Sequence, residues 1–93
     1  MITARHLYIH GTVQGVFYRG WAVDTARRLG LVGWVRNRRD GCVEALVQGD
    51  AAAVERFIAQ ARTGPARATV ERIEEAEAAL DANLADFRQE ATC

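Results

Sequence analysis

An arginine that follows a glycine-containing loop is the first feature of this sequence that suggests chemistry. Arg19 ends the segment 13–19, which contains Gly15 and shows no regular hydrophobic period. Glycine permits backbone angles that let successive N–H groups converge on one point, and a planar guanidinium binds phosphate through two parallel hydrogen bonds. The segment therefore predicts an anion site that favours phosphate; a surface arginine in an ordinary turn is the alternative.

An asparagine supplies the second candidate group. Asn37 ends an apolar segment rich in valine and tryptophan and precedes the turn sequence Arg-Arg-Asp-Gly. A side-chain amide donates and accepts hydrogen bonds at once, so it suits holding a water molecule beside a bound phosphate. Taken alone, an asparagine in this position is more typical of ordinary turn chemistry.

The composition excludes several familiar mechanisms. The chain has 93 residues, and its twelve acidic residues are balanced by twelve basic ones, all of them arginine. It contains no lysine and no serine. Catalysis by a serine nucleophile, Schiff-base chemistry and the lysine-dependent phosphate loop of nucleotide hydrolases are therefore excluded.

The two cysteines do not form a recognisable metal or redox motif. Cys42 and Cys93 have no CxxC spacing and no nearby histidine, so we expect no metal and no cofactor. Two free thiols are the favoured interpretation, with a Cys42–Cys93 bridge as the alternative. No stretch approaches the roughly 20 apolar residues of a membrane span, and residues 1–5 lack the apolar core of a signal peptide. These features predict a cytoplasmic protein that has no membrane partner and forms one domain over residues 1–93.

Charge is distributed unevenly along the chain. Residues 1–67 hold ten arginines against five acidic residues, a balance of +5, and residues 68–93 hold two against seven, a balance of −5. The positive excess peaks between Arg19 and Arg39, which favours a small anionic ligand. The pattern is too mixed for a nucleic-acid partner.

The spacing of apolar residues predicts alternating strands and helices. Leu7 and Ile9 alternate with polar neighbours, as in a strand, and the apolar residues after Asp50 recur at helical spacing. We expect strands over residues 5–12, 31–37, 42–48 and 69–77, and helices over 21–29 and 51–61, the latter capped by Asp50. The tail is ambiguous: residues 74–80 suit a helix, whereas residues 86–89 suit a short fifth strand, which we favour.

The order strand-helix-strand-strand-helix-strand predicts an α+β protein with the ferredoxin-like α/β sandwich fold. Its sheet is mixed and mostly antiparallel, with four or five strands, and both helices lie on one face. The first two strands, joined by a helix, run parallel and end at the same edge of the sheet, which places Asn37 near Arg19. The helices are expected to cover a core of Leu7, Ile9, Val43, Val47, Val54, Phe57 and Ile58, whereas Glu44 and Gln48 point outward.

Three segments together resemble the acylphosphatase family. They read GTVQGVFYR over residues 11–19, LGLVGWVRN over residues 29–37, and Asp40-Gly41 followed by Val43-Glu44. The resemblance continues to about Val70 and covers most of the chain. It implies a metal-independent hydrolase acting on acid anhydrides (EC 3.6.1.7), which splits acyl phosphates into a carboxylate and inorganic phosphate.

The resemblance also implies a role for individual residues. Arg19 is expected to bind the phosphate and Asn37 to orient the attacking water. The backbone amides expected to surround the phosphate belong to Gly15, Val16, Phe17, Tyr18 and Arg19. The implied partners are an acyl phosphate substrate and inorganic phosphate as product and inhibitor, and the protein is expected to be a monomer.

Some alternatives remain at this stage. An RNA-binding module has the same fold, and His6, Tyr8 and His10 line the open face of the first strand. Residues 42–48 offer no aromatic pair on that face, so we interpret these side chains as covering an exposed sheet. A carbamoyl-phosphate-handling domain of a larger maturation protein shares the loop motif. Because no plausible base stands beside Arg19 and Asn37, a substrate phosphate oxygen is expected to take the water proton, rather than His10 or Glu44.

Overall fold

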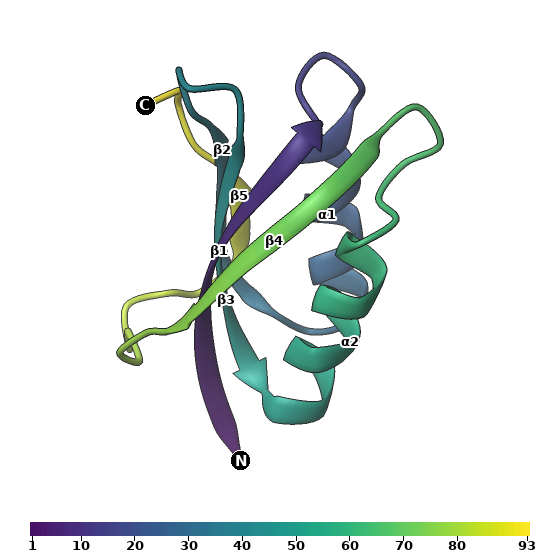
Figure 1. Cartoon of the computed structure of the whole chain (residues 1–93). Coiled ribbons are helices and arrows are strands. Elements are labelled where there is room, and N and C mark those ends of the chain that lie inside the picture. Colours follow the sequence, from purple (N-terminus) through teal and green to yellow (C-terminus); the bar gives the residue numbers. More distant parts are fainter.

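Five strands and two helices follow one another in the predicted order. A computed structural model describes all 93 residues. The strands are β1 (Ile2–Thr12), β2 (Val32–Asn37), β3 (Val43–Asp50), β4 (Thr69–Glu77) and β5 (Phe87–Gln89), and the helices are α1 (Tyr18–Arg28) and α2 (Ala51–Ala61). The strands form one sheet, and both helices cover the same face of it (Figure 1).

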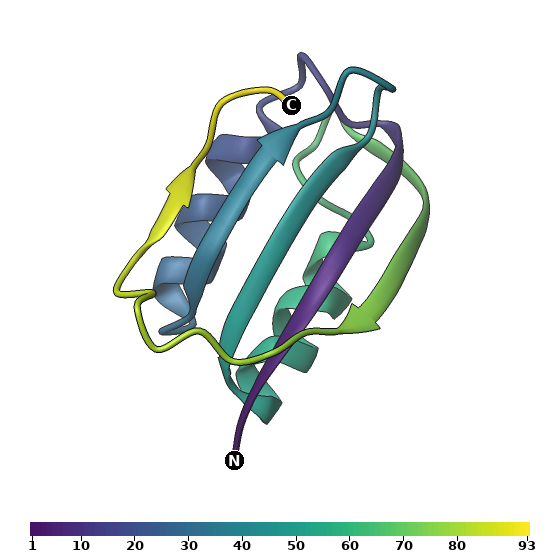
Figure 2. The same ribbon diagram turned by 90° about the vertical axis from the view of Figure 1, so that its left-hand side faces the viewer.

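The sheet has the strand order β4-β1-β3-β2-β5 (Figure 2). β3 pairs antiparallel with both β1 and β2, β1 pairs antiparallel with β4, and β2 pairs parallel with β5. Because β1 and β2 both run against β3, they are parallel to each other and end at the same edge. The ferredoxin-like fold is therefore confirmed, and so is the favoured fifth strand.

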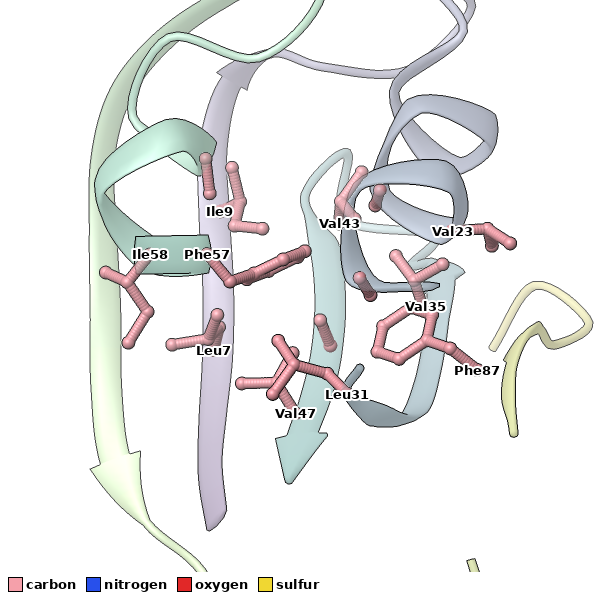
Figure 3. Close-up of a cluster of buried hydrophobic side chains, with 14 of the residues drawn as sticks. Leu7, Ile9, Val23, Leu31, Val35, Val43, Val47, Phe57, Ile58 and Phe87 are labelled. Atoms are coloured by element: carbon pink, nitrogen blue, oxygen red, sulfur yellow. The ribbon is translucent and has the colours of Figure 1, made fainter. Parts of the chain in front are cut away.

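The core lies between the sheet and the two helices (Figure 3). All seven side chains predicted to be buried belong to it. Phe57 of α2 and Phe87 of β5 are both fully buried, with ring centroids 6.1 Å apart. Phe87 thereby fastens the short β5 to the core, since burying a side chain of this size stabilises the fold by about 1.5–3 kcal/mol.

Several element boundaries differ from the predicted ones. α1 begins at Tyr18 rather than residue 21, because the buried Tyr18 side chain packs in the core and its hydroxyl donates to the Ala61 carbonyl at 2.7 Å. β1 begins at Ile2 and β3 runs to Asp50 because these two residues pair with each other. β2 begins at Val32, one residue late. These limits depend on contacts between distant segments, which a local pattern does not contain.

A glycine in β2 keeps the central strands together. Gly33 has a φ of 141°, and a Cβ added to it would overlap the carbonyl oxygen of Leu46 on β3. Only a residue without a side chain allows this approach. The pairing of β2 with β3, and with it the position of the β2 end, therefore depends on glycine at this point.

Both cysteines are free, as the favoured interpretation required. Cys42 is buried and Cys93 is exposed. Burial, together with a hydrogen bond to the Asp40 side chain, raises the pKa of the Cys42 thiol to about 11. Neither helix has the length and apolar character needed to cross a lipid bilayer.

Candidate active site

One cavity, about 130 Å³ in volume, brings the two predicted residues together. Its lining comes from the loop after β1, the first turn of α1, the end of β2 and β5. The cavity is lined by Val13, Gly15, Phe17, Tyr18, Arg19, Gly20, Asn37 and Gln89. Of the five residues predicted to surround the phosphate, 15–19, only Val16 does not line it, because its side chain packs against the core.

The backbone amides at this site have no acceptor within the chain. Trp21 is the first residue of α1 whose amide bonds to a carbonyl, that of Phe17, at 3.0 Å. The amides of Gly15, Val16 and Phe17 form no backbone hydrogen bond. Free N–H groups at the start of a helix sit at the positive end of its dipole and attract an anion.

The loop holds an unusual backbone conformation. Phe17 is the only residue other than glycine with a positive φ, 67°, and it follows Gly15, whose φ is 74°. A left-handed conformation costs a side-chain-bearing residue about 1–2 kcal/mol and is retained where the surroundings impose it. Here it turns the chain into α1 and leaves the Phe17 ring 69% exposed beside Gly20 at the cavity.

Arg19 is the cationic group of the cavity. It stands in the first turn of α1, at the junction of loop and helix, and is half-buried. None of the ion pairs of the chain involves it. Its guanidinium is therefore available to an anion from outside the protein.

Asn37 is held by its main chain while its side-chain oxygen is left unbonded. It pairs with Val43 at the end of β2, and its carbonyl accepts from the Cys93 amide at 3.0 Å. The Cys93 carbonyl in turn accepts from the Arg39 amide at 2.9 Å, so the C-terminal segment follows β2 to its end. The Oδ1 atom of Asn37 is buried and accepts no hydrogen bond. A buried acceptor of this kind favours a hydrogen-bond donor such as water.

Two glutamines at the site were missed by the sequence reasoning. Gln89 lines the cavity because β5 pairs with β2 in parallel, opposite Val35. Gln14 donates through Nε2 to the carbonyls of Arg38, at 2.7 Å, and Cys42, at 2.9 Å. It therefore ties the loop 13–17, which is expected to bind phosphate, to the turn between β2 and β3. The only available signal was their amide chemistry, which has no local periodicity.

Glu44 lies on the face of the sheet away from the helices, but it is not exposed as predicted. Its side chain is only 3% exposed, and it accepts from His6 at 2.6 Å, Arg36 at 2.8 Å and Arg38 at 3.1 Å. Burial alone would raise the pKa of this carboxyl, but these hydrogen bonds lower it to about 2. Gln48 is likewise buried, since its amide bonds to the main chain of Asp81.

The residues considered as general bases lie outside the cavity. Glu44 is fully occupied by its three donors, and His10 pairs with Glu74 at 3.1 Å. Neither lines the cavity of Arg19 and Asn37. No group of three or more histidine, cysteine, aspartate or glutamate side chains is arranged to hold a metal ion.

The open face of the sheet carries an aromatic cluster, and the charged side chains around it pair with one another. His6 stacks near Tyr8 and Trp34, with centroids 4.8 and 6.0 Å away. The Arg36 guanidinium lies over Trp34 and that of Arg38 over Tyr8, and both bond to the buried Glu44. These side chains thus cover the sheet, and their polar and charged atoms bond to one another.

Comparisons with known proteins agree with this geometry. The family model for acylphosphatase matches residues 5–89. A protein named acylphosphatase from Acidovorax sp. (strain JS42) is 57% identical over 86 residues, which cover 91% of this chain and 89% of the relative. The solved acylphosphatase from Coxiella burnetii superposes with a TM-score of 0.91 and 31% identity, covering 96% and 93% of the two chains.

A larger protein contains a similar unit. The solved structure of full-length HypF in the phosphate- and nucleotide-bound form matches with a TM-score of 0.89 and 28% identity. This match covers 99% of the present chain but only 12% of HypF. The family model and the curated relative both extend over most of the sequence. Because these matches cover most of the chain and the solved acylphosphatase has the same fold, this chain belongs to the acylphosphatase family.

Proposed function

We propose that this protein hydrolyses acyl phosphates to a carboxylate and inorganic phosphate without a metal ion, using Arg19 and Asn37. The observation that carries the proposal is the shared cavity. It is lined by Arg19 with its unpaired guanidinium, by loop residues with free amides, and by Asn37, whose buried amide oxygen has no hydrogen-bond partner. The first two suit a phosphate, and the third suits a water molecule beside it.

The phosphoryl group binds to Arg19 and to the amides of the loop. Phosphoryl transfer requires mainly positioning and stabilisation of charge on the phosphoryl oxygens. Arg19 supplies a fixed positive charge and two parallel donors, and the amides of residues 15–19 supply further donors at the start of α1. These groups stabilise the negative charge that develops as the phosphorus–oxygen bond to the acyl group breaks.

The attacking water is held by Asn37. Its Oδ1 accepts from the water while the water oxygen attacks phosphorus, and the acyl carboxylate departs with the electrons of the broken bond. A phosphate oxygen of the substrate takes the water proton, so the products are a carboxylate and dihydrogen or monohydrogen phosphate. An acyl phosphate has a good leaving group, and no covalent enzyme intermediate is needed.

The oligomeric state, the location and the ligands of the protein form a second part of the proposal. We infer that the chain acts as a single-domain, cytoplasmic monomer whose only ligands at this site are the acyl phosphate and inorganic phosphate. Phosphate, as the product that fits the same donors, acts as a competitive inhibitor.

A hydrolysis assay tests the proposal. An aryl acyl phosphate is supplied in EDTA to the wild type, to Arg19→Gln and to Arg56→Gln, which removes an exposed arginine from α2 as a matched control. Losing two charge-assisted hydrogen bonds, each worth about 1.5–3 kcal/mol, lowers kcat/KM by about 10²-fold or more and weakens phosphate inhibition. The control keeps wild-type activity. Activity that is absent in the wild type, or unchanged in Arg19→Gln, would overturn the proposal.

A further inference from the structure

The buried Glu44 carboxylate has no role in the reaction proposed above, yet burying it together with its three hydrogen-bond donors costs free energy. Removing a carboxylate from water costs several kcal/mol, and a buried ion cluster is often no more stabilising than apolar side chains of the same volume. The side chain of Glu44 is 3% exposed and contacts His6, Arg36 and Arg38. Stability alone therefore does not explain the cluster.

The two arginines that Glu44 holds flank Asn37 in the sequence. Both donate to the same carboxylate oxygen, Oε1, Arg36 at 2.8 Å and Arg38 at 3.1 Å. Because side chains alternate along a strand, Arg36 lies on the open face while Asn37 lies on the face of the cavity. Arg38, the first residue after β2, returns to the open face, where its guanidinium lies over Tyr8. Glu44 on β3 thus restrains the strand on both sides of Asn37.

Further contacts leave this arrangement little freedom. The Arg36 guanidinium lies 4.7 Å from the Trp34 ring centre, and that of Arg38 lies 5.5 Å from the Tyr8 ring centre. The main chain of Arg38 accepts from Gln14 of the phosphate loop at 2.7 Å. Arg38 is therefore bonded to Glu44 through its side chain and to the phosphate loop through its carbonyl.

We propose that Glu44 is a positioning residue of the active site: by holding Arg36 and Arg38 across the sheet, it fixes the Asn37 amide relative to Arg19. The inference rests on the proposed role of Asn37. A displacement of about 1 Å in a group that orients a reactant is enough to slow a reaction substantially. Glu44 does not line the cavity and acts only through Asn37.

A double-mutant cycle tests this inference. Glu44→Gln and Asn37→Ala are made singly and together, and kcat is measured with an aryl acyl phosphate alongside the inhibition constant for inorganic phosphate. Glu44→Gln lowers kcat by about 5- to 20-fold and changes the phosphate constant by less than about 2-fold. In the Asn37→Ala background, the same change lowers kcat by less than about 2-fold, because its target is gone.

Controls separate positioning from folding. Glu75→Gln is the matched control, since Glu75 also bonds two arginines, Arg5 at 3.2 Å and Arg62 at 3.1 Å, but lies on β4 away from the cavity. It leaves kcat unchanged. Assays are run well below each variant's melting temperature. If Glu44→Gln does not fold, Arg36→Gln takes its place, because it removes one restraint and leaves Glu44 paired with His6 and Arg38.

The possible outcomes distinguish a failure of the Glu44 inference from a failure of the role proposed for Asn37. Equal losses from Glu44→Gln with and without Asn37 would overturn the inference, and so would an unchanged kcat in the wild-type background. An Asn37→Ala variant with full kcat would instead overturn the proposed role of Asn37, and the inference with it. Loss confined to the background that contains Asn37 is the expected result.

Discussion

At the scale of single residues, Asn37 combines a fixed main chain with an unbonded side-chain oxygen. Its carbonyl is bonded to the Cys93 amide, while its buried Oδ1 has no donor. The fixed main chain limits where this oxygen can lie, and because the oxygen has almost no accessible surface, a small shift of the side chain brings it into contact with a water molecule. The roles proposed for Arg19 and Asn37 are therefore separable, one toward phosphate and one toward water.

This separation leads to a prediction for Asn37→Ala. We expect kcat to fall by about 10²-fold while the inhibition constant for phosphate stays within about 2-fold of wild type, because the lost partner is water. Steady-state kinetics with phosphate as inhibitor measures both values. Asn83→Ala, which alters the other asparagine of the chain in the exposed loop before β5, is the control and keeps wild-type kinetics. Equal loss of phosphate affinity in the Arg19 and Asn37 variants would contradict the division of tasks.

The proximity of Arg19 and Asn37 was predictable because it follows from topology. Two parallel strands joined by a helix end at one edge of a sheet. Asn37 ends β2, and Arg19 stands where the loop after β1 enters α1. The burial of Glu44 was not predictable in the same way. An alternating strand places Glu44 away from the core, but only the arrival of His6, Arg36 and Arg38 from neighbouring strands closes that face over it.

At the scale of elements, the strands and helices were largely predictable and their ends were not. Leu7 and Ile9, or Val54 and Phe57, carry periods that are visible in the sequence. The start of α1 depends instead on a left-handed Phe17 and on the Tyr18 hydroxyl reaching α2. The fifth strand depends on a parallel pairing with β2 that no local pattern specifies.

The close approach of β2 to β3 predicts a large effect of Gly33→Ala. The new Cβ overlaps the Leu46 carbonyl, and the backbone conformation disfavours any side chain. We expect a loss of about 2–4 kcal/mol in the free energy of unfolding, measured by chemical denaturation. Gly30→Ala isolates the conformational part, because Gly30 has a φ of 73° with no atom within 4 Å of an added Cβ. It costs about 1 kcal/mol. Equal losses in the two variants would contradict the steric argument.

The hydrogen bonds that join Glu44 of β3 to Arg36 of β2 predict that stability depends on pH. Its pKa is lowered from 4.5 to about 2 in the folded protein. A depressed carboxyl pKa stabilises the fold fully above the unfolded value, so this contribution is lost as pH falls from about 4.5 toward 2. The slope is at most about 1.4 kcal/mol per pH unit for one group.

Urea unfolding at pH 7, 4 and 3 measures this loss. Wild type and Glu44→Gln are compared at each pH, and the stability difference between them shrinks as the pH falls, because glutamine does not titrate. A difference that stays constant over this range would show that the Glu44 carboxylate contributes nothing through its charge.

At the scale of the whole molecule, the two oppositely charged parts of the chain pair with each other. Arg5 and Arg62 bond to Glu75, and Arg27 bonds to Asp86. These bridges connect the basic residues 1–67 with the acidic residues 68–93. The overall balance is zero, while Arg19 remains outside every ion pair. An anion approaching the cavity therefore encounters a local positive charge rather than a basic surface.

The same surface predicts a monomer. The large apolar residues that are well exposed are few and lie in three separate segments: Met1 with Ile2, Phe17, and Leu80. A stable interface normally contains a contiguous apolar centre. Sedimentation equilibrium at micromolar concentration is expected to give the chain mass of 10.3 kDa. A concentration-dependent mass of twice this value would contradict the expectation.

The path of the C-terminal segment along β2 makes the protein suitable as a reporter of its own occupancy. Cys93 is the exposed thiol, its main chain bonds to both Asn37 and Arg39, and the competing Cys42 is buried. A thiol-reactive fluorophore therefore attaches at one position, next to Asn37, the residue proposed to orient water. The N-terminus emerges at the opposite end of the sheet (Figure 2). Immobilisation through that end leaves both the dye and the cavity facing the solution, an arrangement suited to a phosphate sensor.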